Sequence, residues 1–403
     1  MKPLGPIPAG YEADAHGNLL IGGHTASSLA EAGTPLFAYD ARRITAQVVR
    51  FRAAFPGVAL HYAIKANPYA PLLEHMASQV DGFDVASAGE IERVSGHRLP
   101  VSFAGPGKRD ADLEAAIRAG VAINLESETE AERALAIANR LGATPSLAIR
   151  VNPPFGLKGA GMKMGGHGSP FGIDHDRVPA LVRTLAAAGA TWHGLHIYAG
   201  SQALSADAVI ELQRATIALA AEIAEQAGHA PAYVNLGGGF GIPYFAKDEP
   251  LDLDAVGTAL TKTLAERPNV LRDTDFAIEL GRWLVGEAGV YLTRIVDRKL
   301  SRGRTFLVTD GGLHHMLAAS GNFGQLLRRN YPVAIANRFG AAAEEEVTVV
   351  GCLCTPLDLL ADEALLPSAE VGDLVAIFCA GAYGLSASPT GFLSQPEAME
   401  MLV

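Results

Sequence analysis

Cysteine is scarce in this sequence, with three residues among 403: Cys352, Cys354 and Cys379. Three cysteines are too few for the disulfide framework that stabilises many secreted proteins, so their number predicts a reducing compartment. The sequence also lacks a run of about 18 apolar residues that would span a membrane. Its first ten residues contain no apolar core of a signal peptide. We therefore expect a cytoplasmic protein without a membrane-spanning or secreted part.

Basic residues are in the minority. The chain has 32 lysines and arginines against 43 aspartates and glutamates, which gives a formal net charge of −11. Nucleic acids and anionic membranes bind basic surfaces, so we expect neither as a partner. With 49% hydrophobic and 19% charged residues, the chain can bury a large core and is not disordered. Its length corresponds to about two domains, or to one large barrel with an appendage.

What the sequence does contain, from about residue 58, is a regular alternation. Short apolar runs alternate with longer stretches rich in alanine, leucine and glutamate. There are eight such runs: VALHYAIKAN, DGFDVAS, PVSFAGPGK, VAINLES, SLAIRVNP, TWHGLHIYAGS, AYVNLGGGF and DFAIELGR. Because each parallel strand needs a crossover, eight units predict an α/β protein with a closed (β/α)8 TIM barrel. An open doubly wound sheet would carry its glycine-rich turn after the first strand, whereas here that turn follows the seventh.

The pattern changes after about residue 284. Strand-like runs separated by turns follow, with helical spacing only around residues 359–366, and they predict a β-rich second domain. The first 35 residues are too short to fold alone and are expected to join one of the two bodies. We therefore predict a barrel over residues 36–283 and a β-rich domain made of residues 1–35 and 284–403. The glycine-rich stretch 156–168 is expected to form a mobile loop near the barrel mouth.

Function in barrels of this kind lies where the strands end. The predicted strand ends carry a set of polar residues and glycines: Lys65, Asp84, His196, Tyr198, Ser201, Gly237, Gly238, Gly239, Glu279 and Arg282. A lysine, a triple glycine and a glutamate that converge on one rim suggest a phosphorylated cofactor held covalently.

Each of these residues also has an ordinary structural explanation. Lys65 is equally compatible with a lysine that reaches solvent from a strand end, residues 237–239 with a tight turn, and Glu279 with an ion pair to Arg282. Cys354 is compatible with a small buried residue. In the functional interpretation, Lys65 is a Schiff-base lysine, the glycines hold a phosphate, and Glu279 bonds to a pyridine nitrogen and keeps it protonated. Together they fit pyridoxal 5′-phosphate better than other cofactors, and we predict no metal site.

These motifs resemble the alanine-racemase-like, fold-type III class of pyridoxal-phosphate enzymes. Within that class the sequence is similar to the diaminopimelate, ornithine and arginine decarboxylases, from about Pro35 to the C-terminus. The similar segments are YAIKANP, GFDVASAGE, GLHIYAGSQ, NLGGGF, ELGR, TDGG, GCLCTPLD and GAYG.

The resemblance implies a role for each matching residue. The catalytic residues would be Lys65 and Cys354, with the cysteine supplied by the neighbouring subunit of a homodimer. The cofactor-binding residues would be Lys65, Asp84, His196, Tyr198, Ser201, Gly237, Gly238, Gly239, Glu279, Gly281, Arg282 and Tyr383. The substrate-binding residues would be Arg282, Asp310, Arg328, Tyr331, Thr355 and Asp358.

Glu279 discriminates within the class. Racemases of this fold place an arginine against the pyridine nitrogen, whereas a carboxylate there favours the full electron withdrawal that loss of CO₂ needs. The resemblance therefore implies a carboxy-lyase, an amino-acid decarboxylase. A racemase or eliminase on the same fold, a non-catalytic regulator and a sugar-phosphate-binding barrel remain as alternatives.

Three departures from the family pattern bear on the substrate. Tyr198 stands where the family has a histidine stacked on the pyridine ring, and Thr355 replaces the acid that pairs with a distal ammonium in amine-specific enzymes. The segment that grips diaminopimelate is only loosely matched by LLRRNYPV, which contains Arg328, Arg329 and Tyr331. We therefore expect a free or carrier-bound L-amino acid without a distal ammonium, in a specialised pathway of the exosortase or antibiotic-cluster kind. The loop 156–168, with Lys158 and Lys163, either admits a bulky group or is a disordered loop without a role. Diaminopimelate is the alternative substrate.

Overall fold

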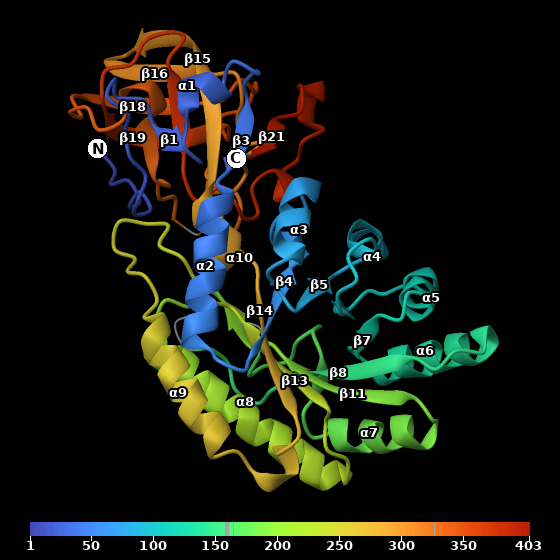
Figure 1. The fold of residues 1–403 in the computed structure, drawn as a ribbon. Helices are drawn as coiled ribbons and strands as arrows, with labels where there is room; N and C mark the ends of the chain where they lie inside the picture. Colours follow the sequence, from blue (N-terminus) through green and yellow to red (C-terminus); the bar gives the residue numbers. More distant parts are fainter. Residues whose placement is uncertain (158–160, 164, 326) are drawn as a thin grey trace. The chain divides into compact units, whose positions relative to one another are not determined.

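A computed structural model of the chain describes residues 1–157, 161–163, 165–325 and 327–403. The chain divides into two compact units (Figure 1). The barrel unit contains residues 48–241 and 251–281, and the β-rich unit contains residues 1–47, 242–250 and 282–403. Of the expected loop at residues 156–168, Lys158 and the side chain of Lys163 lie outside the described residues.

The described part of the barrel unit forms a closed ring of eight parallel strands. The strands are β4 (Ala59–Ala63), β5 (Gly82–Val85), β6 (Val101–Phe103), β7 (Ala122–Leu125), β8 (Ser146–Asn152), β11 (Thr191–Ile197), β13 (Tyr233–Gly238) and β14 (Asp275–Leu280). Their order around the ring is β8-β11-β13-β14-β4-β5-β6-β7, and β7 pairs with β8 to close it. Each ring strand lies in one of the eight apolar runs, which confirms the predicted barrel. The short strand β10 (Ile173–Asp174) adds to β8, and β9 (Met162–Lys163) pairs with β12 (Gly200–Ser201).

One helix precedes the first of these strands, and the others lie between successive strands. Their bounds are α2 (Ala41–Ala54), α3 (Ala70–Ala77), α4 (Ala88–Val94), α5 (Asp110–Arg118), α6 (Glu128–Leu141), α7 (Val178–Ala187), α8 (Ala206–Ala227) and α9 (Leu253–Ala265). Several begin at a side chain that accepts a hydrogen bond from the backbone N–H three residues later, as at Ser127, Ser205 and Asp252. Two end at a glycine in the left-handed conformation, Gly142 and Gly228. Because the eight ring strands run parallel, their C-terminal ends, and therefore the site, lie at one rim of the barrel.

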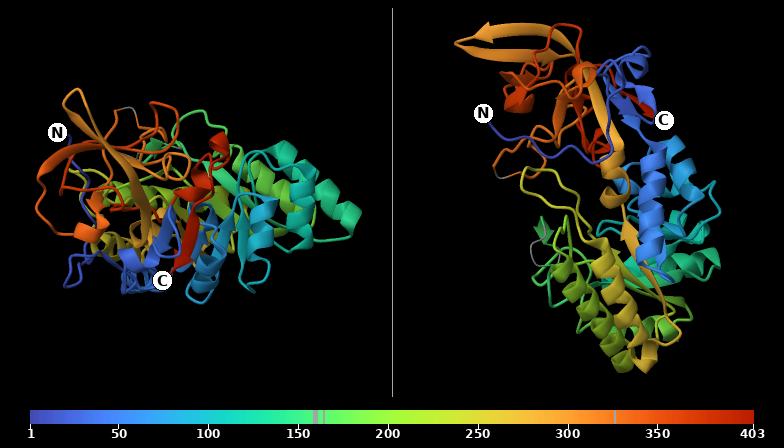
Figure 2. Two further views of the ribbon diagram at one scale, coloured as in Figure 1. Left: turned by 90° about the horizontal axis from the view of Figure 1, so that it is seen from above. Right: turned by 60° about the vertical axis from the view of Figure 1, so that its left-hand side comes forward.

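The β-rich unit is built on a mixed sheet. Its strands are β3 (Leu36–Tyr39), β15 (Gly289–Ser301), β16 (Arg304–Thr309), β17 (Val333–Ile335), β18 (Glu345–Val350), β19 (Leu359–Leu366), β20 (Leu374–Ile377) and β21 (Met399–Leu402). The order is β17-β20-β15-β16-β18-β19, with β3 between β15 and β21. Strands β15 and β16 form the long orange hairpin in Figure 2. The first 35 residues contribute β1 (Leu20–Ile21), β2 (His24–Thr25) and α1 (Ala26–Leu29) to this unit and to its core.

The helical spacing expected around residues 359–366 is wrong, because this segment is strand β19. It pairs antiparallel with β18, and its apolar side chains are buried by that pairing. Leucine and alanine favour helices locally, but the strand partner decides the conformation here. Glu363 has a φ of 49° next to a register shift between the two strands, which marks a bulge rather than a helical turn.

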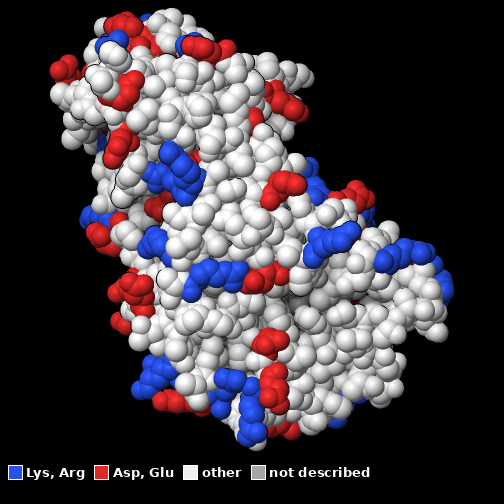
Figure 3. All heavy atoms as spheres, viewed as in Figure 1, with Lys and Arg blue, Asp and Glu red and all other residues white. Residues whose placement is uncertain are grey.

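Surface charge, the hydropathy of the helices and groups of metal-ligating side chains can be compared with the sequence. Basic and acidic side chains are interspersed over the face seen in Figure 3. In the described residues, no helix is both long and apolar enough to cross a membrane. The same residues contain no group of three or more His, Cys, Asp or Glu side chains placed to hold a metal ion.

Candidate active site

A cavity of about 260 Å³ opens at the rim of the barrel unit. It is lined by Lys65, Asp84, Val85, Ala86, Ala104, Gly105, Pro106, Arg150, Phe171, His196 and Glu279. The barrel therefore brings together Lys65, Asp84, His196 and Glu279 from the predicted set. Lys65 lies in the 3₁₀ turn Ile64–Ala66 that follows β4, where its side chain is exposed between buried neighbours. Its Nζ is 5.7 Å from the centre of the Tyr198 ring.

Glu279 lies on β14 with its carboxylate buried. Its Oε2 is 3.0 Å from His196 Nε2 and accepts a hydrogen bond from Asn235 Nδ2 at 3.3 Å. Burial alone would raise the pKa of Glu279, but the adjacent His196 imidazole, with further positive charge from Lys65 and Arg150, holds that pKa well below its usual range. Glu279 is therefore an ionised carboxylate inside the barrel.

Asn235 was missed by the sequence reasoning, although it lies in the predicted motif NLGGGF. Its Nδ2 donates a hydrogen bond to Glu279, and its Oδ1 accepts one from the backbone N–H of Gly237 at 2.8 Å. One amide thus connects the buried carboxylate to the glycine loop.

The glycine loop is packed too closely for side chains. Gly237 and Gly239 have φ values of 69° and 76°, and a Cβ on Gly237 would lie 2.7 Å from the carbonyl oxygen of Ile197. A Cβ on Gly239 would collide with the carbonyl of Gly200. Next to it, the buried Ser201 hydroxyl has no hydrogen-bond partner among the described residues. Bare backbone and an unsatisfied hydroxyl together suit a phosphate group.

Gly281 ends the barrel portion of the ELGR motif. A Cβ there would lie 2.7 Å from the Ala66 side chain, beside the turn that carries Lys65. The glycine allows β14 to end directly against that turn.

These residues fit pyridoxal 5′-phosphate. Lys65 offers an exposed amine, the glycine loop and Ser201 offer a phosphate cradle, and Glu279 offers a negative charge. The Nδ1 of His196 is also without a hydrogen-bond partner in the described structure.

Asp84 has a buried partner that the sequence reasoning missed. His61 on β4 places its Nδ1 3.4 Å from Asp84 Oδ2 and its Nε2 3.2 Å from the Tyr233 hydroxyl. Burial alone would lower the pKa of His61, but the Asp84 carboxylate raises it. Gly82 pairs with His61 across β4 and β5, and a Cβ there would lie 2.7 Å from the imidazole. A glycine inside a predicted strand was the available signal for this histidine.

In the β-rich unit, Arg282 lies at the start of α10 (Arg282–Val285) and contacts aromatic side chains. It donates a hydrogen bond to the Tyr244 hydroxyl at 2.7 Å, and its guanidinium lies 4.7 Å from the centre of the Tyr383 ring. The Tyr331 ring packs 4.8 Å from that of Tyr244. Burial raises the pKa of Tyr244 to about 12, so its hydroxyl keeps its proton. The predicted residues Arg282, Tyr331 and Tyr383 thus form one cluster, and Tyr244 is its missed member.

Cys354 and Thr355 lie in the turn between β18 and β19. The Cys354 side chain is exposed and Thr355 is half-buried. Asp358, at the end of this turn, is buried and accepts hydrogen bonds from the backbone N–H groups of Leu313 and Leu353, at 2.6 and 2.8 Å. Asp358 therefore fixes the turn that carries Cys354.

Asp310 uses its carboxylate inside the β-rich unit. It accepts hydrogen bonds from the Thr293 hydroxyl at 2.7 Å, the Arg294 backbone N–H at 2.9 Å and the Thr34 hydroxyl at 2.6 Å. Both carboxylate oxygens are occupied by these contacts.

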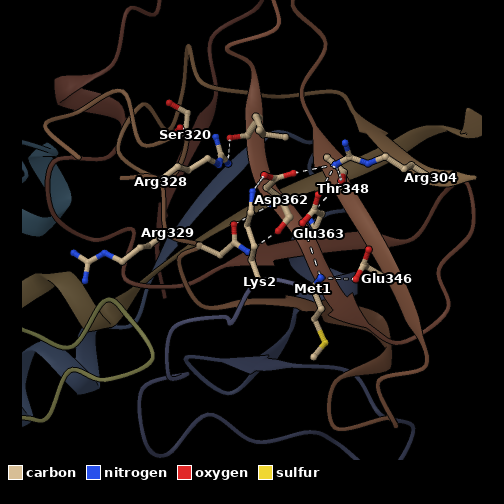
Figure 4. A network of polar contacts seen from close by, with 12 residues as sticks. Met1, Lys2, Arg304, Ser320, Arg328, Arg329, Glu346, Thr348, Asp362 and Glu363 are labelled. Atoms are coloured by element: carbon tan, nitrogen blue, oxygen red, sulfur yellow. Dashed lines mark hydrogen bonds and ion pairs between the residues drawn. The ribbon is translucent and has the colours of Figure 1, made fainter. Parts of the chain in front are cut away.

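The two arginines of LLRRNYPV have different surroundings (Figure 4). Arg328 donates to the carbonyl oxygens of Ser320 and Leu359, at 2.7 and 2.5 Å. Arg329 points away from that network, with its guanidinium 3.5 Å from the centre of the Phe245 ring. The contacts of Arg328 thus connect the segment that follows β16 to the start of β19.

Comparisons with known proteins identify the family of this chain. The chain matches the family described as pyridoxal-dependent decarboxylase, pyridoxal binding domain, over residues 41–286. It is 36% identical over 383 residues to the L-glutamyl-[BtrI acyl-carrier protein] decarboxylase of Niallia circulans, covering 92% of this chain and 88% of that protein. It is 33% identical over 379 residues to the diaminopimelate decarboxylase of Archaeoglobus fulgidus, covering 93% and 88%.

Solved structures give the same result. The diaminopimelate decarboxylase of M. jannaschii in complex with L-lysine superposes with a TM-score of 0.86 at 26% identity, covering 98% of this chain and 92% of that one. The family match spans more than half of the chain and includes the strand ends described above. This chain therefore belongs to the pyridoxal-dependent decarboxylases, amino-acid carboxy-lyases whose cofactor is pyridoxal 5′-phosphate.

Proposed function

We propose that this decarboxylase acts on an L-amino acid or aminoacyl group that has no free distal ammonium, attached to a carrier protein. The observation that carries the proposal is that the residue following Cys354 is Thr355 rather than an acid. Thr355 stands at the position of the acid in amine-specific relatives, and the carboxylates of Asp310 and Asp358 are taken up by hydrogen bonds within the β-rich unit. A substrate ammonium would therefore lack the charge-assisted hydrogen bond that selects it.

The similarity to the Niallia circulans enzyme supports the same substrate class. That relative acts on an L-glutamyl group attached to an acyl-carrier protein, and it aligns over 92% of this chain. The similarity to diaminopimelate decarboxylases keeps diaminopimelate as the second candidate.

The residues of the barrel unit are assigned as follows. When bound, pyridoxal phosphate accepts the electrons of the breaking bond between Cα and the carboxylate. Lys65 supplies the amine that binds the cofactor, and the glycine loop and Ser201 bind its phosphate. Glu279 holds a proton at the pyridine nitrogen, because an ionised carboxylate in a buried site favours a neighbouring positive charge. Tyr198 lies beside the Lys65 amine and offers an aromatic face to the pyridine ring.

The residues of the β-rich unit complete the assignment. Cys354 donates the proton that replaces CO₂ at Cα, and its exposure leaves the thiol accessible for that transfer. Arg282 and Tyr383 bind the phosphate or the substrate carboxylate, and Tyr331 packs beside them. We further propose a cytoplasmic homodimer, in which Cys354 of one protomer serves the site of the other.

CO₂ release from a substrate panel tests the proposal. The panel comprises glutamyl-carrier protein, free glutamate, N-acylated amino acids, ornithine and meso-diaminopimelate, with Lys65→Ala as the inactive control. The expected result is the highest kcat/KM on a carrier-bound or acylated substrate. Efficient turnover of meso-diaminopimelate with little on the others would overturn the proposed substrate and leave the decarboxylase intact.

A further inference from the structure

Glu126 lies behind the cavity wall and bonds to three parts of it. Its Oε1 accepts hydrogen bonds from the backbone N–H of Gly105 at 2.6 Å and from the Arg150 guanidinium at 2.8 Å. Its Oε2 accepts a hydrogen bond from the backbone N–H of Gly172 at 3.1 Å. The Glu126 side chain is only 2% exposed, so solvent does not compete for these bonds.

The three bonded groups lie in or next to different strands of the barrel unit. Glu126 directly follows β7, Gly105 follows β6, Arg150 lies within β8, and Gly172 precedes β10. Gly105 and Arg150 line the cavity, as does Phe171, which precedes Gly172. One carboxylate therefore fixes three neighbouring segments of the same wall.

The glycines permit this close approach. Gly172 has a φ of 74°, and a Cβ there would lie 2.9 Å from the carbonyl oxygen of Arg150 and the nitrogen of Asn152. Gly105 has a φ of 136°. Both positions therefore need glycine for the backbone to reach Glu126. The Arg150 guanidinium lies 4.9 Å from the centre of the Phe171 ring, which completes this side of the wall.

A second pair of charges extends the cluster outward. Lys108 Nζ donates to Glu130 Oε1 at 2.8 Å and to the carbonyl oxygens of Gly105 and Asn124, at 2.7 and 2.8 Å. Gly105 is thus held at its N–H by Glu126 and at its carbonyl by Lys108. Two carboxylates and two cations balance one another, as buried charges must.

The ionisation state of Glu126 agrees with this geometry. Burial alone would raise its pKa, but the charges of Arg150 and Lys108 lower it below the usual value. Glu126 is therefore an anion that accepts all three hydrogen bonds at once.

We propose that Glu126 is a positioning residue for the cofactor: it ties the Gly105 and Gly172 segments to Arg150, and so sets the cavity wall before pyridoxal phosphate binds. This inference rests on the proposed assignment of the cavity as the cofactor site. Glu126 itself does not line the cavity, so its effect on binding is transmitted through the wall.

The test compares Glu126→Gln with Glu130→Gln. Both variants remove one negative charge from the same buried cluster. The Glu130 carboxylate, however, accepts its hydrogen bond from Lys108 and not from Gly105 or Gly172. Hydrogen exchange of the apoprotein reports the amides of Gly105 and Gly172, and titration with pyridoxal phosphate reports its dissociation constant. We expect Glu126→Gln to speed exchange at both glycines and to weaken cofactor binding about tenfold or more. Glu130→Gln should leave exchange at Gly172 and the dissociation constant near wild type.

Equal loss of stability in both variants, with wild-type exchange at the glycines and wild-type cofactor affinity, would overturn the inference. If Glu126→Gln does not fold, Glu126→Asp gives the same readout, because the shorter side chain keeps the charge but does not span both glycines. A wild-type protein that fails to bind the cofactor would instead overturn the site assignment, while exchange at Gly105 and Gly172 still reports the role of Glu126 in the wall.

Discussion

The barrel unit and the β-rich unit hold their parts of the site in different ways. In the barrel unit, Glu279 and Glu126 are buried and paired with His196 and Arg150 inside the strand ring. In the β-rich unit, Cys354 is exposed on a turn in which the Asp358 carboxylate accepts hydrogen bonds from backbone N–H groups. Buried, paired groups keep their geometry, whereas exposed turns change by substitution at low cost.

This difference suggests how one scaffold serves several substrates. In the barrel unit, loss of either Glu126 or Arg150 would leave a buried charge unpaired, so substitution of these residues is expected to be costly. Thr355 is half-buried in a turn, so the side chain there can vary without affecting the barrel. Substrate selection is therefore expected to depend on the β-rich unit, and catalysis of bond cleavage on the barrel unit.

The largest expected effect is at Lys65. Lys65→Ala removes the amine that binds the cofactor, so decarboxylation should fall to background and the visible absorbance of the bound cofactor should disappear. Lys262→Ala, which removes an exposed lysine of α9, is the matched control and should keep wild-type activity. A Lys65→Ala variant that still releases CO₂ would contradict the assignment.

Glu279→Gln should have the next largest effect. The substitution removes a buried negative charge while it preserves size, so kcat should fall about a hundredfold or more with the fold retained. Because the pKa of Glu279 is below its usual range, the wild-type carboxylate stays ionised as the pH falls towards 5. A pH–rate profile whose acid limb above pH 5 disappears in the Gln variant would argue against this role.

Thr355→Glu tests the contribution of the β-rich unit. A carboxylate at this turn supplies the missing partner for a distal ammonium, so kcat/KM for ornithine or meso-diaminopimelate should rise about tenfold relative to the acylated substrate. Thr355→Gln introduces a side chain of nearly the same size as glutamate but without its charge, so this variant should not change the ratio. If both variants shift the ratio equally, shape rather than charge sets the preference.

The smallest expected effect is on the stability of the β-rich unit at acidic pH. The buried His314 has no hydrogen-bond partner among the described residues, and burial, with the adjacent His315, lowers its pKa from 6.5 to about 4. The unfolded chain therefore binds a proton that the folded chain does not. Because solvent partly screens this group, we expect the unit to lose on the order of 1 kcal/mol of stability as the pH falls from 6.5 to 4.

Unfolding of the wild type and of His314→Gln, followed between pH 4 and pH 8, measures this contribution. The variant should show a flatter dependence of unfolding free energy on pH. Parallel curves for the two proteins would show that His314 does not contribute to the acid sensitivity.

The barrel could be predicted because each of its strands can be recognised from a few consecutive residues. Each strand is a short apolar run with a polar residue at or just after its end, such as Glu279 in β14 and Lys65 after β4. The β19 strand was missed because its leucines and alanines favour a helix locally, and only pairing with β18 makes it extended.

The missed site residues have one cause in common. Asn235, His61 and Glu126 act through partners on other strands, and sequence spacing does not say which strands are neighbours. For His61 and Glu126, the glycines Gly82 and Gly172 were the signals in the sequence. Each leaves room for a neighbouring group that a side chain would block.

Competition between two substrates tests the central claim most directly. Equimolar glutamyl-carrier protein and meso-diaminopimelate, each labelled with a different carbon isotope in the carboxylate that is lost, are mixed with the enzyme, and the isotopes in the released CO₂ are counted. We expect the label of the carrier-bound substrate to predominate in the wild type and the excess to shrink in Thr355→Glu. Predominant release from meso-diaminopimelate by the wild type would contradict the claim.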